Sequence, residues 1–252
     1  MAAQKHTEQR SLRTVRATRY VTPLREGGSL PGLIEADDDG LYVLKFRGAG
    51  QGSLALVAEI IAGETGRQLG LPVPELVLIE VDAQLAAAEP DPEIQMLIKA
   101  SIGLNLGVDF LPGAFPFAPP VDPSFAADVV WFDSLFTNVD RTVKNPNILF
   151  WQGRFFLIDH GAALHSQHGS AGLASTALAP FPYIKQHILL PFAGSILEAQ
   201  ERMVPHLENG FEKSAELVPG DWFVQHPRNA YVEHLKTRMQ NGQFAREAEN
   251  AR

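Results

Sequence analysis

Short segments of alternating or continuous apolar residues occur in the first half of the chain, and they predict β-strands. Strict alternation is typical of a strand that buries one face. Glycine-containing turns at residues 25–32 and 37–40 separate the first three segments. The strands are expected at residues 14–22, 33–36, 41–46, 76–81 and 104–112, with the first at an edge of the sheet.

The spacing of apolar residues becomes helical between residues 54 and 69. Val57, Ile60 and Ile61 recur at intervals that place them on one side of a helix, and Gly70 ends the segment. Further helices are expected at residues 125–136, 197–207, 211–217 and 229–239. A β-rich first third followed by a helix-rich remainder predicts an α+β fold with two lobes.

The same pattern divides the chain into five parts. We expect a disordered arm, a β-rich amino-terminal lobe, a proline-rich linker between the lobes, a mainly helical carboxy-terminal lobe and a frayed polar tail. These parts are expected at residues 1–13, 14–111, 112–123, 124–241 and 242–252, respectively.

Composition narrows the class of protein only modestly. The 252 residues are 45% hydrophobic and 20% charged, as in ordinary globular proteins. A net charge of -8 argues against nucleic acid as a direct partner, and no apolar run is long enough to span a membrane. The chain has no cysteine, and its basic start lacks the apolar stretch of a secretory signal. We therefore expect a cytoplasmic protein that has no membrane partner.

Candidate chemistry begins in a polar stretch after the helix at 125–136. Asp140 and Arg141 are the candidate catalytic residues, with Arg141 expected to fix the loop or to neutralise charge near it, and Asn145 follows five positions after the acid. Protein kinases use this Asp-to-Asn spacing, in which the carboxylate acts on the acceptor hydroxyl and the carboxamide holds magnesium. Asn, Asp and Pro are also common turn residues, so this stretch alone leaves an ordinary turn open.

The segment that follows supplies another carboxylate. Apolar runs at residues 148–150 and 155–158 surround a short turn and predict a β-hairpin. The second run ends at Asp159, which stands two residues before Gly161. Kinases place a second metal-binding aspartate after such a hairpin, so Asp159 favours a kinase catalytic centre over a simple turn.

A nucleotide site is expected in the amino-terminal lobe. Lys45 lies on the predicted strand at 41–46, on the face shared by Leu41 and Val43, where a kinase places the lysine that contacts the α- and β-phosphates. The expected partner of Lys45 is Glu59 on the first helix, with Glu64 as the alternative.

Two backbone segments are expected to complete that site. The turn containing Gly27, Gly28 and Ser29 would let amide groups approach phosphate oxygens without interference from Cβ atoms. The backbone near Phe110 and Leu111, at the end of the last predicted strand, is expected to meet the adenine.

With these residues in place, the chain resembles the HipA-like kinases, in particular short stand-alone domains of that family. The resemblance covers roughly residues 27 to 165. It is carried by the stretches Asp37–Gly48, Val57–Glu59, Leu69–Glu75, Phe110–Ala114, Asn138–Asn147 and Leu157–Leu164.

The resemblance implies an ATP-dependent Ser/Thr protein kinase with a protein-kinase-like fold. It implies that Lys45 and Glu59 form the nucleotide clamp, that Asp140 is the catalytic base and that Asn145 and Asp159 hold Mg²⁺. It also suggests autophosphorylation at Ser29 and an antitoxin-like partner protein. The chain departs from ordinary protein kinases in having Asp159-His160-Gly161, and Arg141 after rather than before the catalytic acid.

Several alternatives remain open from the sequence. A small-molecule acceptor fits the same catalytic residues as a protein acceptor. A pseudokinase that binds nucleotide without transferring phosphate is a second alternative. Against it, the chain keeps all five polar residues of the expected site, which are Lys45, Glu59, Asp140, Asn145 and Asp159. The third is a metal-dependent hydrolase that would use His160, His165 and His168, although their spacing matches no zinc motif.

Overall fold

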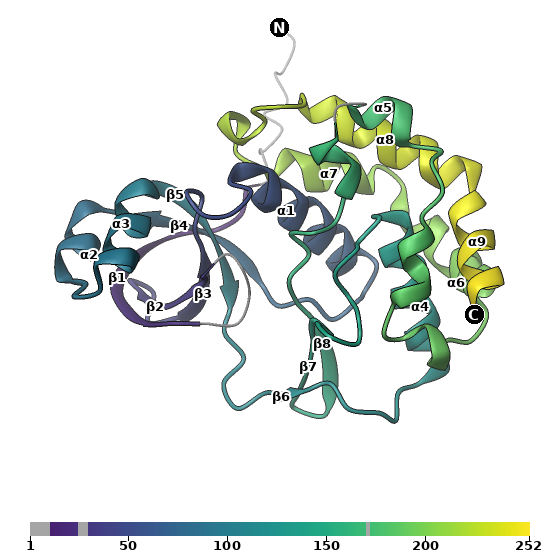
Figure 1. Ribbon diagram of the computed structural model, residues 1–252, viewed down its shortest axis with the longest axis horizontal. Coiled ribbons are helices and arrows are strands. Elements are labelled where there is room, and N and C mark those ends of the chain that lie inside the picture. The colour runs from purple at the N-terminus through teal and green to yellow at the C-terminus, as the bar shows by residue number, and fades with distance from the viewer. Residues whose placement is uncertain (1–10, 25–29, 170–171) are drawn as a thin grey trace, which may run out of the picture.

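Two lobes lie side by side, a barrel of strands and a larger assembly of helices (Figure 1). The computed structural model describes residues 11–24, 30–169 and 172–252. The two-lobed α+β arrangement expected from the sequence is confirmed. The turn at Gly27, Gly28 and Ser29 lies outside the described residues, as do residues 1–10 of the expected arm.

The smaller lobe is a closed five-stranded barrel in the order β1-β2-β3-β5-β4. All neighbouring strands are antiparallel except β1 and β4, which are parallel. The prediction that the first strand lies at an edge is wrong, because β1 pairs on both sides and closes the barrel. The strands are β1 (Thr14–Pro23), β2 (Gly32–Ala36), β3 (Leu41–Lys45), β4 (Leu76–Val81) and β5 (Gly103–Asp109).

Side-chain alternation on β3 positions Lys45. Tyr42 and Leu44 are buried with the apolar side chains of the barrel core, whereas Leu41, Val43 and Lys45 occupy the opposite face. Successive side chains of a strand point to opposite sides, so Lys45 leaves the barrel core and is free to reach the second lobe.

Two short helices, α2 (Ala83–Ala88) and α3 (Pro92–Ala100), pack against the barrel core. No helix is expected from the sequence at α2, which has only six residues and few apolar ones. Asp82 caps α2 and Asp91 caps α3, each accepting hydrogen bonds from backbone amides of the first turn. Leu85 and Ile98 then bury themselves among the strand residues.

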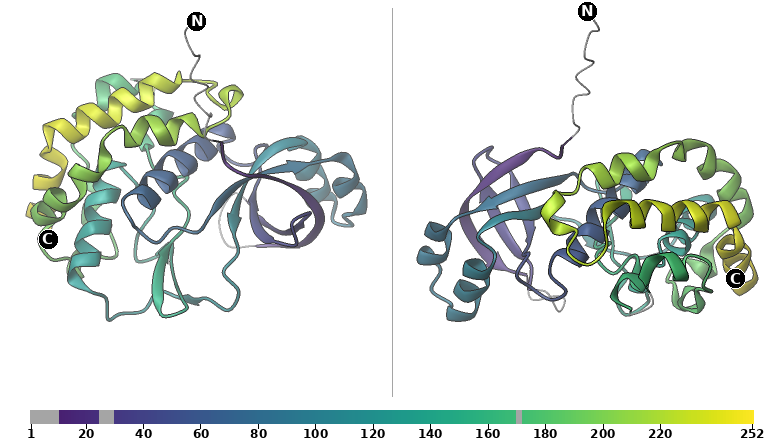
Figure 2. Two further views of the ribbon diagram at one scale, coloured as in Figure 1. Left: turned by 180° about the vertical axis from the view of Figure 1, so that it is seen from behind. Right: turned by 90° about the horizontal axis from the view of Figure 1, so that it is seen from above.

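Helix α1 (Ser53–Gln68) follows the barrel strand β3 but packs with the helical lobe, as the views in Figure 2 also show. Its Thr65 hydroxyl lies 2.9 Å from the Ser214 hydroxyl, and Gln68 donates a 2.7 Å hydrogen bond to the same oxygen. A Cβ on Gly66 would come within 3.2 Å of the Val73 side chain, so glycine permits this helix to approach Val73 closely. The larger lobe thus holds the helix that carries Glu59.

The larger lobe is built around α4 (Pro123–Leu135), in which all residues from Val129 to Leu135 are buried. A small sheet in the order β6-β7-β8 precedes the remaining helices: β6 (Phe115–Pro116), β7 (Ile148–Trp151) and β8 (Arg154–Leu157). The α-helices that follow are α5 (Gly172–Thr176), α6 (Ile196–Met203), α7 (Gly210–Glu216), α8 (Arg228–Asn241) and α9 (Gln243–Ala251). The described residues of this lobe also form 3₁₀ helices at His165–His168, Pro182–Gln186, Leu190–Phe192, Val204–Leu207 and Gly220–Trp222.

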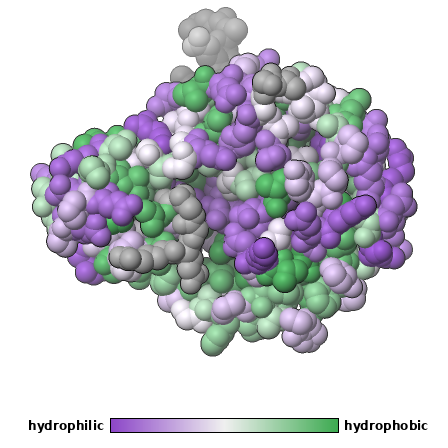
Figure 3. Space-filling model, viewed as in Figure 1, coloured by the Kyte–Doolittle hydropathy of each residue, from purple (hydrophilic) through white to green (hydrophobic). Residues whose placement is uncertain are grey.

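The proline-rich segment between the lobes contains no helix, and its β6 pairs with β7. The region of β6 to β8 forms an apolar part of the surface, visible along the lower edge of Figure 3. Phe115 and Phe150 are exposed there. Within the described residues, no helix combines the length and apolar character needed to cross a membrane.

The prediction of a frayed tail at 242–252 is wrong. Residues Gln243–Ala251 form α9, which buries Phe244, Ala245 and Ala248 on one side against α4 and α6. The three apolar residues are too few to stand out among charged neighbours, although their spacing is helical. The described end of the expected amino-terminal arm is also ordered, because Leu12 is buried in the main core.

Truncating the anchor of α9 should therefore destabilise the protein. Phe244 is 3% exposed, and its ring lies 5.8 Å from that of Trp131 on α4. We expect Phe244→Ala to lower the free energy of unfolding by about 3–5 kcal/mol in chemical denaturation. The same change at Phe115, which is 68% exposed, should cost less than about 1 kcal/mol. Equal losses would mean that α9 does not belong to the core.

Candidate active site

Lys45 lies at the junction of three elements that are distant in sequence. Its Nζ is 2.6 Å from Oε2 of Glu59 on α1 and 2.8 Å from Oδ1 of Asp159, which follows β8. Glu64, the alternative partner, instead forms an ion pair with Arg67 of its own helix. The structure therefore joins the barrel, α1 and the end of the hairpin through one ammonium group.

The two carboxylates keep Lys45 charged. Burial by itself disfavours the charged form of this lysine, but Asp159 and Glu59 outweigh burial and raise its pKa above the ordinary value. Burial likewise opposes ionisation of Glu59, yet Lys45 and His160 lower the pKa of that carboxyl. The cluster is thus a fixed positive charge held between two negative ones.

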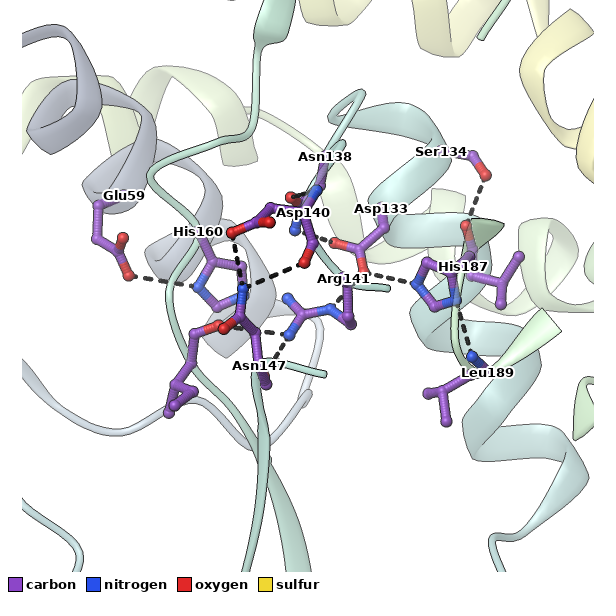
Figure 4. Close-up of polar contacts among 12 residues, drawn as sticks. Glu59, Asp133, Ser134, Asn138, Asp140, Arg141, Asn147, His160, His187 and Leu189 are labelled. Carbon is purple, nitrogen blue, oxygen red and sulfur yellow. Dashed lines mark hydrogen bonds and ion pairs between the residues drawn. The ribbon is translucent and has the colours of Figure 1, made fainter. Parts of the chain in front are cut away.

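His160, the residue after Asp159, faces Glu59, as Figure 4 shows. The ring is fully buried, with Nδ1 3.6 Å from Oε1 of Glu59, and it forms an edge-to-face contact with the ring of Phe132 on α4. Next to it, a Cβ on Gly161 would stand 3.4 Å from Oε2 of Glu59. His160 and Gly161 thus pack against the carboxylate of Glu59, which contacts Lys45.

Asp140 lies in the loop between α4 and β7, and two carboxamides contact its carboxylate. Nδ2 of Asn145 is 2.7 Å from Oδ2 of Asp140, and Nδ2 of Asn147 is 3.3 Å from the same oxygen. Partial burial raises the pKa of Asp140 above its ordinary value, and the Asp159 charge acts in the same direction, while the two carboxamides oppose it. A carboxylate with a raised pKa is suited to accept a proton.

The contacts of Arg141 indicate that it positions the loop of Asp140 and does not contact a ligand. Its side chain is completely buried, with Nε 2.5 Å from Oδ2 of Asp133 on α4. Its Nη1 donates hydrogen bonds to the backbone carbonyls of Asn147 and Ile158. One guanidinium therefore ties the loop of Asp140 to α4 and to the two residues that flank the hairpin, one before β7 and one after β8.

Asp133 is the buried carboxylate that organises the loop, as Figure 4 shows. Besides Arg141, it accepts a 2.9 Å hydrogen bond from Nδ2 of Asn138 and another of 2.9 Å from Nε2 of His187. Leu189 donates its backbone amide to Nδ1 of His187, so the imidazole proton must be on Nε2. Although burial opposes ionisation, Arg141 and His187 lower the pKa of Asp133.

Sequence reasoning did not assign Asp133, Asn147 or His187 to the site. Asp133 carries a visible signal, because it interrupts the apolar residues 129–136, whereas His187 follows the polar residues Lys185 and Gln186 and stands out less. Buried polar groups need partners, and such an interruption therefore marks an internal network. Asn147 carries no such signal, since it looks like part of an Asn-Pro-Asn turn.

The expected adenine contact at Phe110 and Leu111 follows the last barrel strand. The amide of Phe110 donates to the carbonyl of Leu41, and the carbonyl of Leu111 accepts from Ala114. Two backbone groups of the pair are left for a ligand among the described residues, the carbonyl of Phe110 and the amide of Leu111.

The histidines do not assemble a metal centre in the part of the chain that the structure describes. His160 faces Glu59, whereas the ring of His165 lies against Tyr183. The described residues contain no group of three or more His, Cys, Asp or Glu side chains placed to hold a metal ion. The hydrolase alternative therefore has no ligand set there.

Comparisons with known proteins identify the family and the fold. A model of the family described as HipA-like kinase matches residues 18–250. The fold is similar to that of the Helicobacter pylori proinflammatory kinase CtkA, with a TM-score of 0.58, 15% identity, and coverage of 94% of this chain and 97% of that one. A Golgi casein kinase with Mn/ADP bound gives a TM-score of 0.49 at 12% identity, covering 96% of this chain and 74% of its own. No curated protein matches in sequence.

Neutralising the central carboxylate should be costly. We expect Asp133→Asn to lower the free energy of unfolding by about 3–5 kcal/mol, because it leaves the Arg141 guanidinium buried without its counter-ion. Asp128→Asn on the same helix is the matched control. Its partner Arg202 is largely exposed, so chemical denaturation should show a loss below about 1 kcal/mol. Similar losses in both variants would contradict the central role of Asp133.

The network also predicts a pH dependence of stability. Burial, opposed by Asp133, lowers the pKa of His187 below its ordinary value, so the unfolded chain binds this proton more readily than the folded one. Neutral His187 therefore contributes to the free energy of unfolding above about pH 6.5, and this contribution is lost as the pH falls. The midpoint temperature of thermal unfolding should fall less steeply between pH 7.5 and 5.5 in His187→Gln than in the wild type. Glutamine keeps a donor and an acceptor but does not titrate. An unchanged slope would show that His187 does not titrate in this way.

Proposed function

Because the chain belongs to the HipA-like kinase family, we propose that it transfers the γ-phosphate of ATP to a serine or threonine hydroxyl of a protein. The observation that carries this proposal is the position of Lys45, which contacts both Glu59 and Asp159. That arrangement fixes a cation where nucleotide phosphates are bound in kinases. A cytoplasmic location, where ATP is abundant, is part of the proposal.

The nucleotide would lie between the barrel and the helical lobe. Lys45 would contact the α- and β-phosphates, with Glu59 holding its ammonium group in place. The turn of Gly27, Gly28 and Ser29 would cover the phosphates, as expected from the sequence. The carbonyl of Phe110 and the amide of Leu111 would meet the adenine, because both lack a backbone partner among the described residues.

The donor set near Asp159 fits Mg²⁺, which prefers carboxylate and carboxamide oxygens. Asp159 uses Oδ1 for Lys45, which leaves Oδ2 for a cation. Asn145 is the carboxamide expected from the sequence, and its amide nitrogen is directed at Asp140, so its oxygen is also available. When bound, the metal would offset the charge that the phosphates carry during transfer.

In the transfer step, the acceptor hydroxyl oxygen forms a bond to the γ-phosphorus as the bond to the β,γ-bridging oxygen breaks. Asp140 takes the proton of the hydroxyl, and ADP leaves with the electron pair of the broken bond. Asn145 and Asn147 orient the Asp140 carboxylate for this role. Arg141 holds the loop from behind and touches no reacting atom.

The choice of acceptor rests on the family resemblance, and a small hydroxylated molecule is the alternative. The presence of Asp140 beside the contacting pair Lys45 and Asp159 in this set of residues favours catalysis over nucleotide sensing, because a pseudokinase has no need of a residue that accepts the proton.

Removing either acid should stop phosphoryl transfer without unfolding the protein. We expect Asp140→Ala to lower the rate by about 10²–10⁴-fold and Asp159→Ala to reduce it to background. The measurement is ATP consumption and autophosphorylation by the purified protein with Mg²⁺, with circular dichroism as the check on folding. Glu201→Ala, an exposed position on α6, should retain full activity. A rate close to that of the wild type in either acid variant would overturn the assignment.

A further inference from the structure

Two asparagines, not one, have their carboxamides on Asp140. Asn145 donates through Nδ2 to Oδ2 of Asp140, and Asn147 donates through Nδ2 to Oδ2 and to the backbone carbonyl, at 3.3 and 3.4 Å. In Figure 4 the amide of Asn147 reaches up to the Asp140 group. Neither Oδ1 atom has a partner among the described residues, and a hard cation binds this oxygen rather than the nitrogen. The side-chain bonds alone therefore do not separate the two candidates.

The backbone separates them. The carbonyl of Asn147 accepts a 3.0 Å hydrogen bond from the amide of Ile158, the residue immediately before Asp159. Asn147 also directly precedes β7, which pairs with β8. The hairpin ladder thus locks Asn147 opposite the segment that delivers Asp159, whose carboxylate is the other expected ligand.

Asn145 is placed differently. Its carbonyl accepts from the amide of Thr142, and its own amide donates to the Thr142 hydroxyl, which closes a separate turn in the loop. The residue is exposed, whereas Asn147 is 8% exposed and its carbonyl also accepts from the buried guanidinium of Arg141. A ligand gains from such rigidity, because its orientation is fixed before the cation binds.

The backbone conformation at the two ends of the hairpin is also matched. Asn147 has a φ of 49° and Asp159 has a φ of 56°, both in the left-handed region. Asn and Asp tolerate this region better than other residues with a side chain. A left-handed residue at the start of β7 and another after β8 direct both side chains away from the regular alternation of the strands.

From these observations we propose that Asn147, rather than Asn145, is the carboxamide ligand of the catalytic divalent cation, paired with Asp159. Asn145 then acts on the solvent side of Asp140 as a positioning residue. This assignment rests on the proposed phosphoryl-transfer function. It also links the two parts of the site, because the same Asn147 side chain binds the cation through Oδ1 and holds Asp140 through Nδ2.

The test measures cation binding without turnover. Mn²⁺ is titrated into the full chain in the presence of the non-hydrolysable ATP analogue adenylyl imidodiphosphate, and free Mn²⁺ is followed by electron paramagnetic resonance. Asn147→Gly removes the carboxamide and keeps a residue that accepts a positive φ. We expect it to weaken Mn²⁺ binding about ten- to a hundredfold. Asn145→Ala should bind Mn²⁺ within about twofold of wild type.

A third variant guards against loss of folding. Asn147→Asp keeps an oxygen ligand and tolerates the left-handed backbone, so it should restore Mn²⁺ binding while losing the donor to Asp140. The assignment is overturned if Asn145→Ala weakens binding and Asn147→Gly does not, if the two weaken it equally, or if Asn147→Asp fails to restore it. Failure of the wild-type chain to bind the Mn²⁺–nucleotide complex would instead contradict the proposed function itself.

Discussion

The loop that contains Asp140 depends on one buried ion pair, between Asp133 of α4 and Arg141 of the loop. Both side chains are completely removed from solvent, so neither charge is tolerable without the other. The Asp133 carboxylate also accepts a hydrogen bond from Asn138, which precedes Asp140, whereas Arg141 follows Asp140. The network therefore holds the loop on both sides of Asp140. Such a pair contributes mainly to the precise position of the loop, because the cost of burying two charges offsets much of their attraction.

The second constraint is an ion-pair cluster that is divided between the lobes. Lys45 belongs to the barrel, whereas Glu59 belongs to a helix that is bonded to the helical lobe through Ser214. Asp159 adds a further contact from the segment after β8. The cluster therefore connects the two lobes. Movement of one lobe against the other would have to break or carry these bonds, which couples the geometry of the site to the arrangement of the lobes.

The elements that sequence reasoning found are those with a strong local pattern. The five barrel strands, the hairpin and the helices α1, α4, α6, α7 and α8 all carry clear periodicity, and the structure contains each of them near the expected bounds. The short α2, α3 and α5 and the charged α9 were not expected, because short or mainly polar helices owe their stability to capping and to packing against other elements. The role of the first strand was also misjudged, since closure of a barrel depends on a partner about 60 residues away in sequence.

The sequence by itself determined the order of the two lobes and the types of chemical group in the site, because spacing and residue type are local properties. It named Lys45, Asp140 and Asp159, and the structure brings Lys45 and Asp159 into contact. Only the tertiary structure decided which groups hold these residues in place. Asp133 and His187 are 54 positions apart, and their hydrogen bond exists only because burial forces each polar group to find a partner. The distinction between Asn145 and Asn147 likewise comes from the pairing of β7 with β8, which no local pattern encodes.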